Sequence, residues 1–221
     1  MHINDIKDKL PGDLYEVLSK SVGELRSCQE KAVNLGLLEN KSLLVCTPTA
    51  SGKTLVGEIA LVKCVMEGRG KGIYIAPLKA LASEKYNDFK KKYAGLIRSA
   101  ISIGDLDSVD SYLSEYDIIF CTSEKLDSLI RHSAPWLKYV KTVVVDEIHL
   151  LNDSERGPTL EITLTLLKSV LPGLQLVGLS ATIGNPDELA GWLGAGLVLD
   201  SWRPVKLKKG VYFGGRVEFF D

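Results

Sequence analysis

A run of eight residues, rich in small and hydroxyl side chains, has the composition of a loop that binds phosphate. Its members are Thr47, Pro48, Thr49, Ala50, Ser51, Gly52, Lys53 and Thr54. The run follows a predicted strand and opens a predicted helix, which is the context that such a loop requires. Backbone N–H groups would point at phosphate oxygens, Lys53 would reach the β- and γ-phosphates, and the Thr54 hydroxyl would hold Mg²⁺. The pattern G-x-x-x-x-G-K-S/T is broken at its first position, where Thr47 replaces glycine.

Two acidic residues form a second candidate site. Asp146 and Glu147 directly follow three valines, at the carboxyl end of a predicted strand. Ligands of open parallel sheets bind at those ends. Asp146 is placed to hold Mg²⁺, directly or through water, and Glu147 to take a proton from an attacking water. Because an acidic pair at a strand end can also be a loop cap, the prediction depends on the combination of this pair with Lys53.

The elements that must position these residues alternate along the chain. Predicted strands cover residues 43–46, 72–76, 100–103, 118–121, 142–145 and 176–179. Predicted helices cover 54–66, 80–93, 124–131 and 158–170, and a short helix begins at Asn185 and Pro186. Strands that are apolar throughout and are separated by helices indicate a mostly parallel sheet with helices on both faces, an α/β fold.

Composition narrows the class of protein. The chain has 221 residues, of which 45% are hydrophobic and 25% charged, and its net charge is −1. A protein that coats nucleic acid by bulk charge would be strongly basic, so any phosphate contact must be local. Residues 63–98 carry a local charge of +6 and residues 105–127 one of −6, which we interpret as two solvated faces.

Apolar runs and cysteines favour a cytoplasmic protein that does not bind a membrane. The longest apolar runs have the length of strands, and the N-terminus lacks an apolar signal core. The four cysteines form no C-x-x-C pair and have no partnering histidine cluster, so we expect reduced, buried thiols and no zinc site.

A third short motif completes a family pattern. Together with Ser180, Ala181 and Thr182, the two candidate sites resemble the first motor domain of a superfamily-two helicase, with D-E-I-H at 146–149. The fit is closest to the Ski-like branch and, within it, to archaeal DNA-repair helicases. The residues that resemble further motifs of the branch are 25–29, 77–85, 122–125, 184–186 and 202–205. The resemblance implies a RecA-like ATP-binding domain over residues 1–200, and a crossover with the start of a second motor domain over 201–221.

The resemblance also implies roles for individual residues. Gln29 would hydrogen-bond adenine, since its amide offers both a donor and an acceptor. Three residues would couple the Mg²⁺ site to the interface between motor domains: His149, Ser180 and Thr182. Four residues are expected near nucleic-acid phosphates, where contacts fix position without reading sequence. They are Lys79, Gly104, Asp105 and Thr122.

For the complete protein, the resemblance implies a DNA-dependent ATPase and 3′–5′ DNA helicase. It would use ATP and Mg²⁺, act as a monomer on single-stranded or forked DNA, and serve repair or the restart of stalled replication forks. A complete motor also carries a Q-x-x-G-R-x-x-R element whose arginines complete the ATP site. The glutamines here are Gln29 and Gln175, and neither begins that element. We therefore expect an N-terminal piece without its second motor domain, which binds ATP but turns it over slowly or not at all.

Three alternatives stay open. An RNA helicase of the same branch would grip a backbone through the same motifs. An unrelated phosphate-loop enzyme, such as a small-molecule kinase, would not need the glutamine motif or the motif at 180–182. A nucleotide-gated binding module without enzymatic activity would not need Lys53, Asp146 and Glu147, although it can describe the isolated piece.

Overall fold

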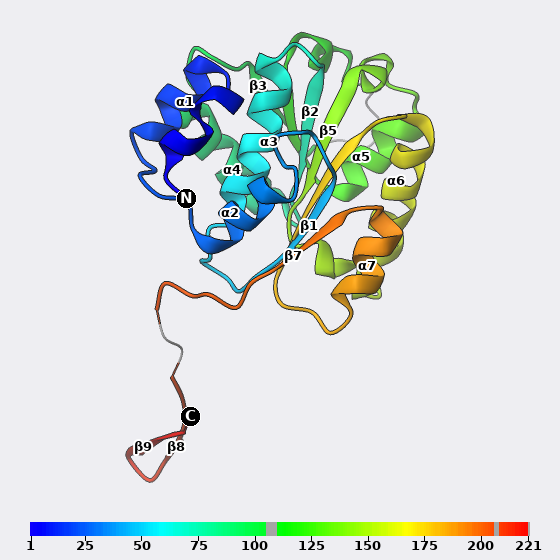
Figure 1. Ribbon diagram of the computed structural model, residues 1–221. Helices are drawn as coiled ribbons and strands as arrows, with labels where there is room; N and C mark the ends of the chain where they lie inside the picture. The colour runs from blue at the N-terminus through cyan, green and yellow to red at the C-terminus, as the bar shows by residue number, and fades with distance from the viewer. Residues whose placement is uncertain (105–109, 206–207, 221) are drawn as a thin grey trace.

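A parallel β-sheet forms the centre of the molecule. The computed structural model describes residues 1–104, 110–205 and 208–220. Within them a seven-stranded sheet has the order β3-β4-β2-β5-β6-β1-β7, and all of its pairings are parallel (Figure 1). The strands are β1 (Leu43–Cys46), β2 (Lys71–Ile75), β3 (Ser99–Ser102), β4 (Ile118–Cys121), β5 (Val140–Val145), β6 (Gln175–Ser180) and β7 (Gly196–Leu199). The predicted α/β fold is confirmed.

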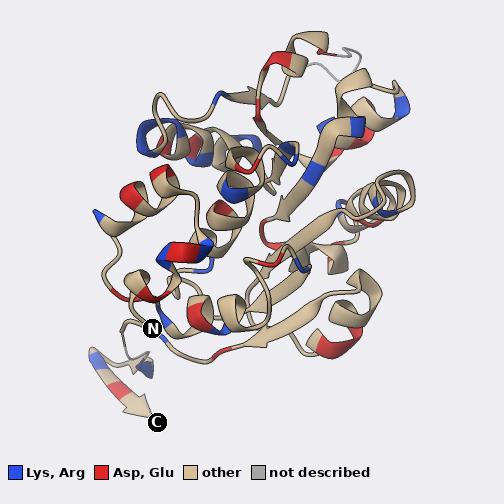
Figure 2. Ribbon diagram, turned by 45° about the horizontal axis from the view of Figure 1, so that its top comes forward, with Lys and Arg blue, Asp and Glu red and all other residues tan. Residues whose placement is uncertain are grey.

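Helices cover both faces of this sheet. On one face lie α1 (Gly12–Ser19), α2 (Ser27–Asn34), α3 (Thr54–Met66) and α4 (Lys79–Lys92) (Figure 1). On the other lie α5 (Ser123–Arg131), α6 (Gly157–Val170) and α7 (Pro186–Leu193). Both basic and acidic residues occur on the helices (Figure 2).

The apolar strands divide their side chains between two cores. Leu43 and Val45 of β1 pack with α2 and α3, whereas Leu44 and Cys46 point to the opposite face. Each buried valine or leucine contributes about 1.5–3 kcal/mol relative to its exposed state. Because successive side chains of a strand point to opposite faces, a strand covered on both sides must be apolar throughout.

Most predicted elements agree with the structure to within one or two residues at each end. The helix predicted over 54–66 has those bounds, and the strand predicted over 72–76 lies one residue earlier. Sequence analysis missed β7, α1 and α2. In β7 only Val198 is buried, so its apolar pattern is weak.

An antiparallel hairpin follows the sheet. It comprises β8 (Lys209–Phe213) and β9 (Arg216–Phe220). The segment 200–205 runs away from the sheet (Figure 1). Gly214 and Gly215 both have positive φ, as a two-residue hairpin turn requires. Val205 and Lys208 lie outside any strand. The domain boundary at residue 200 stays a prediction.

Two further expectations concern burial. All four cysteines are free and buried, as predicted, and burial raises the pKa of the Cys121 thiol to about 12. In the described parts of the chain, no helix is both long and apolar enough to cross a membrane.

Candidate nucleotide site

The phosphate loop, residues 47–54, connects β1 to α3. The Thr47 N–H donates to the Ser180 carbonyl at 3.1 Å, which anchors the loop to the end of β6. The Thr47 hydroxyl lies 2.7 Å from the Ser51 hydroxyl, and both side chains are buried. This pair explains how threonine can replace the first glycine of the pattern, since its side chain is bound within the loop itself. Lys53 is also buried, whereas Thr49 and Ala50 are exposed and Pro48 is covered.

Residues at the start of α2 hold three consecutive loop carbonyls. The Arg26 guanidinium donates to the Ala50 carbonyl at 2.9 Å, and the Cys28 thiol to the Ser51 carbonyl at 3.5 Å. The Gln29 amide donates to the Gly52 carbonyl at 2.9 Å. Ala50 and Gly52 both have positive φ, so the loop follows a sharply turned path that these contacts keep in place.

Gln29 therefore has a place in the structure that the sequence did not predict. Its Oε1 atom accepts the Arg26 N–H at 2.8 Å, while its Nε2 atom binds Gly52. The side chain is 4% exposed. One amide hydrogen and one oxygen lone pair are left for other partners. Hydrogen bonding to adenine is compatible with this geometry and stays a prediction, whereas support of the phosphate loop is observed.

The acidic pair lies beside the loop. Lys53 Nζ is 3.5 Å from Glu147 Oε1, and His149 Nδ1 is 3.3 Å from Glu147 Oε2 without hydrogen-bond geometry. Glu147 has a left-handed backbone with φ 50°, which turns the chain sharply at the end of β5. Non-glycine residues rarely adopt this conformation outside sites that constrain them. The structure thus brings together the two motifs that the sequence separates by about ninety residues.

Asp146 is held by two donors. Its Oδ2 atom accepts the Tyr74 hydroxyl at 2.7 Å, and its Oδ1 atom accepts the Glu147 N–H at 3.0 Å. Burial, together with the charge of Asp146, raises the pKa of Tyr74 well above its usual value, so Tyr74 stays a donor. Sequence analysis missed Tyr74. The available signal was a tyrosine inside an apolar strand, because a buried hydroxyl usually requires a partner.

The residues present fit Mg²⁺ carried by a nucleotide. Asp146 supplies a half-buried carboxylate and Thr54 a hydroxyl at the first residue of α3. These hard oxygen donors suit Mg²⁺, which is usually bound by one or two carboxylates with substrate phosphates and water. No cluster of three or more potential metal-binding side chains occurs among the residues described.

A cavity of about 480 Å³ opens beside the phosphate loop. Its lining combines side chains from the start of α2 with the beginning of α3. Among the lining residues are Arg26, Gln29, Gly52, Thr54 and Glu58. The volume is in the range of small-molecule pockets, and the position next to Gln29 suits a base attached to phosphates bound by the loop.

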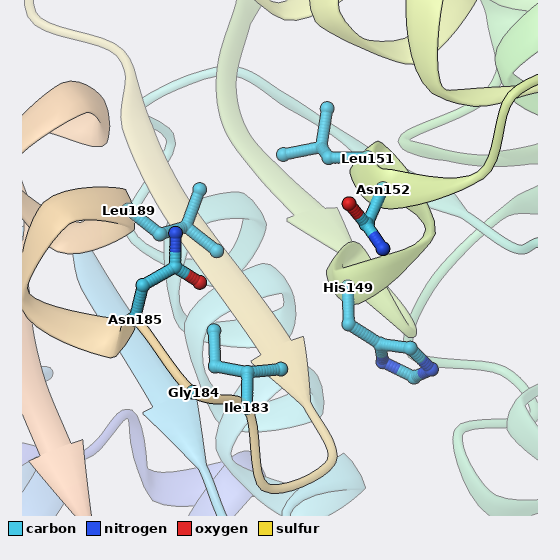
Figure 3. A pocket seen from close by; sticks show the side chains of 7 residues that line it. All are labelled: His149, Leu151, Asn152, Ile183, Gly184, Asn185 and Leu189. Atoms are coloured by element: carbon cyan, nitrogen blue, oxygen red, sulfur yellow. The ribbon is translucent and has the colours of Figure 1, made fainter.

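The three predicted coupling residues lie on neighbouring segments. Ser180 is buried and binds the phosphate loop through its carbonyl, whereas Thr182 is exposed. His149 faces a second cavity, of about 490 Å³ (Figure 3). The turn after β5 contributes His149, Leu151 and Asn152 to its lining, and the segment after β6 contributes Ile183, Gly184, Asn185 and Leu189. The geometry places the three residues near one another, and their coupling role stays a prediction.

Three predicted nucleic-acid residues follow three adjacent parallel strands. Lys79, Gly104 and Thr122 come after β2, β3 and β4, at the carboxyl ends of these strands. We call these three residues the backbone strip, after the nucleic-acid backbone that they are predicted to contact. Lys79 and Gly104 are exposed. Thr122 is buried, and its hydroxyl accepts the Lys125 N–H at 3.4 Å as the cap of α5. Asp105 lies outside the described residues.

Comparisons of sequence place the chain among helicases. A family model described as DEAD/DEAH box helicase matches residues 26–189. The ATP-dependent DNA helicase Hel308 of Methanocaldococcus jannaschii is 57% identical over 216 residues, which are 94% of this chain and 18% of that protein. Hel308 of Pyrococcus abyssi is 50% identical over 217 residues, or 98% of this chain and 30% of that protein. The motifs also resemble those of the archaeal DNA-repair helicase Hjm.

Solved structures agree in fold. Mycobacterium smegmatis helicase Lhr, bound to single-stranded DNA and AMP-PNP, has a TM-score of 0.75 at 26% identity, over 87% of this chain and 28% of Lhr. The DUF1998 helicase MrfA, bound to DNA and AMPPNP, has a TM-score of 0.73 at 24% identity, over 88% of this chain and 30% of MrfA. The chain thus spans less than a third of the length of these relatives. The family match and the Hel308 relatives together show that this chain belongs to the DEAD/DEAH box helicase family.

Proposed function

We propose that this chain is the ATP-binding motor domain of a DNA-dependent ATPase and DNA helicase. The observation that carries the proposal is the 3.5 Å contact between Lys53 and Glu147, which joins the phosphate loop to the D-E-I-H motif at one edge of the sheet. The names of the Hel308 relatives support ATP and DNA as the ligands of the complete protein.

The residues of the site suit hydrolysis of ATP. Lys53 binds the β- and γ-phosphates, and its departure from Glu147 frees that carboxylate to accept a proton. The water oxygen bonds to the γ-phosphorus as the bond from this phosphorus to the bridging oxygen breaks, and Glu147 takes the proton of the water. Thr54 and Asp146 hold Mg²⁺, which when bound neutralises charge that develops on the phosphates.

Movement along DNA requires more than this site. The backbone strip, with Asp105, contacts phosphates of single-stranded or forked DNA, and His149, Ser180 and Thr182 pass the state of the nucleotide to a second motor domain. The complete protein moves 3′ to 5′ along DNA and acts as a monomer in the cytoplasm. It serves DNA repair or the restart of stalled replication forks. Because the net charge is −1, DNA binding by the isolated chain is weak and sensitive to salt.

Binding of ATP by this chain tests the proposal. Lys53→Ala removes the charge that pairs with phosphate. Lys138→Ala is the control, because Lys138 is exposed and lies at the amino ends of the strands, away from the phosphate loop at their carboxyl ends. We expect Lys53→Ala to weaken ATP binding by about 10- to 100-fold, as loss of a charge-assisted hydrogen bond predicts, and Lys138→Ala to leave it unchanged. Equal ATP affinity in all three proteins would contradict the proposed site.

The rate of ATP hydrolysis tests the proposed DNA-dependent ATPase activity. Hydrolysis by the wild-type chain is measured alone and with DNA or RNA strands of equal length. We expect slow turnover in every case, because the site lacks the arginines that a second motor domain supplies. Rapid turnover stimulated by DNA would show that one domain suffices, and preferential stimulation by RNA would favour an RNA helicase.

A further inference from the structure

A tyrosine outside the recognised motifs reaches the acidic pair. Tyr74 lies on β2, beside β5, where its backbone is in register with Val144. Its side chain is 2% exposed, and its ring stacks on Phe120 with centroids 5.3 Å apart. The ring therefore has little freedom, and its hydroxyl is fixed at 2.7 Å from Asp146 Oδ2.

This contact acts on the orientation of a carboxylate. The Glu147 N–H binds the other oxygen of Asp146, so one donor from β2 and one from the chain after β5 fix the carboxylate plane. Asp146 is itself half-buried, with its remaining lone pairs free to meet a ligand. Outer partners of this kind orient the groups that bind a metal, and their loss costs about 10- to 100-fold in metal affinity or activity.

We propose that Tyr74 is a positioning residue that aims the Asp146 carboxylate at Mg²⁺ and thereby sets the affinity of the site for the Mg²⁺–ATP complex. The inference rests on the proposed function and deepens it. Tyr74 does not itself touch the nucleotide or the ion, and it acts through Asp146. Its effect should therefore appear in the dependence on Mg²⁺ and not in the affinity for ATP without metal.

A second buried tyrosine supplies a matched control. Tyr93 is 1% exposed and its hydroxyl donates to Glu58 Oε2 at 3.3 Å, so it too joins a buried ring to a carboxylate. Its ring packs on Phe89 in the same core that holds Tyr74. Glu58 keeps a second partner in Lys92 at 2.6 Å. Tyr93→Phe therefore reports the cost of losing a buried hydroxyl without touching Asp146.

The experiment compares wild type, Tyr74→Phe and Tyr93→Phe. A fluorescent ATP analogue is bound to each protein in EDTA, and Mg²⁺ is then added in steps. We expect Tyr74→Phe to raise the Mg²⁺ concentration at half-saturation about tenfold and to leave binding in EDTA within about twofold of wild type. Because Glu58 lines the cavity beside the phosphate loop, Tyr93→Phe can shift binding in EDTA, but it should leave the Mg²⁺ concentration at half-saturation at the wild-type value. Superimposed titrations for all three proteins, or equal shifts in both variants, would overturn the inference.

A double-mutant cycle separates positioning from a general effect on the fold. If Tyr74 acts through Asp146, adding Tyr74→Phe to Asp146→Asn should change the Mg²⁺ response no further, whereas independent effects would add. Mn²⁺ in place of Mg²⁺ gives a spectroscopic readout, in which the electron paramagnetic resonance line shape of the bound ion should change in Tyr74→Phe and stay as in wild type in Tyr93→Phe. Additive effects with an unchanged spectrum would reject the role.

Failure of this inference is distinguishable from failure of the proposed function. If the wild-type chain binds the ATP analogue neither in EDTA nor with Mg²⁺, the nucleotide site itself is rejected. If wild type binds it with a clear Mg²⁺ response and Tyr74→Phe responds identically, the nucleotide site stands and only the role of Tyr74 is rejected. Urea unfolding of each variant checks that the titrations are made on folded protein.

Discussion

Two regions at the carboxyl ends of the strands are built differently: the phosphate loop with the acidic pair, and the backbone strip. Around the phosphate loop and the acidic pair, side chains bind across elements that are distant in sequence, as Gln29 does to Gly52 and Tyr74 to Asp146. In the backbone strip, Lys79 is exposed and the Thr122 hydroxyl caps its own helix.

The difference matches the work that each part is proposed to do. Phosphoryl transfer requires groups held in place before the substrate arrives, because barrier lowering depends on preorganised dipoles and short distances. A grip on a sugar–phosphate backbone needs accessible donors that carry no sequence information. If both proposed roles hold, the nucleotide side is preorganised within this domain, whereas the backbone strip offers exposed groups that need no such preorganisation.

The largest expected effect is on hydrolysis, and it tests the acidic pair beside the phosphate loop. Glu147→Gln removes the proposed proton acceptor while keeping the size of the side chain. We expect single-turnover hydrolysis to fall by about 10²- to 10⁴-fold, the usual contribution of general base catalysis, with ATP still bound. Quenched-flow measurement with enzyme in excess makes slow turnover visible.

Glu161→Gln is the control for this change, because Glu161 is exposed on α6. It should hydrolyse ATP at the wild-type rate. A Glu147→Gln variant with the wild-type single-turnover rate would show that Glu147 is not the base.

A second change tests whether ATP binding depends on the hydrogen bond from Gln29 to the phosphate loop. Gln29→Glu keeps the acceptor for the Arg26 N–H but replaces the donor to the Gly52 carbonyl with an oxygen. We expect ATP affinity to fall about tenfold, since one hydrogen bond is lost and two acceptors face each other. Isothermal calorimetry measures the affinity. Asn34→Asp, the same chemical change at an exposed site on α2, should have no effect, and equal affinities in both variants would show that the loop does not need Gln29.

Local signals explain why the position of the phosphate loop between β1 and α3 was predictable. A glycine, a lysine and a threonine between an apolar strand and a helix define the phosphate loop within a few residues, and the bounds of α3 followed from them. The sheet was predictable for the same reason, since strands such as β1 and β4 are buried at every position.

Contacts between distant residues were not predictable in this way. Tyr74 and Asp146 lie 72 residues apart, and only the pairing of β2 with β5 brings them together. Gln29 was assigned to adenine alone, because no local pattern shows that its amide also reaches Gly52. The edge strand β7 was missed because three of its four residues are not fully buried, which removes the apolar signal.

A smaller effect is expected in the backbone strip. Lys79→Ala should weaken binding of single-stranded DNA by only a few-fold and reduce the slope of log affinity against log salt by about 0.7, the value for one phosphate contact. Fluorescence anisotropy at several salt concentrations measures both quantities. Lys138→Ala, at the amino ends of the strands, should leave the slope unchanged. An unchanged slope in Lys79→Ala would remove Lys79 from the strip.

The smallest effect concerns the amino ends of β3 and β4, two of the strands that carry the backbone strip at their carboxyl ends. There a surface ion pair joins the segments that enter the two strands. Arg98 Nη2 lies 2.9 Å from Asp117 Oδ1, and the Arg98 backbone N–H donates to Asp117 Oδ2 at 3.0 Å. Partial burial opposes ionisation of Asp117, but the hydrogen bonds from Arg98 outweigh it and lower the pKa of the carboxyl. Because Arg98 is exposed, solvent screens the pair, and Asp117→Asn should cost less than about 1 kcal/mol at pH 7.

The pH dependence of this pair has a defined sign. A carboxyl whose pKa is lowered by folding stabilises the protein above its unfolded pKa of about 4, and that contribution is lost as pH falls through the folded pKa. The stability gap between wild type and Asp117→Asn should therefore be constant from pH 7 down to about pH 5 and then shrink in more acidic buffer. Urea unfolding across this range measures the gap. A gap that persists unchanged at low pH would mean that Asp117 acts by packing and not by charge.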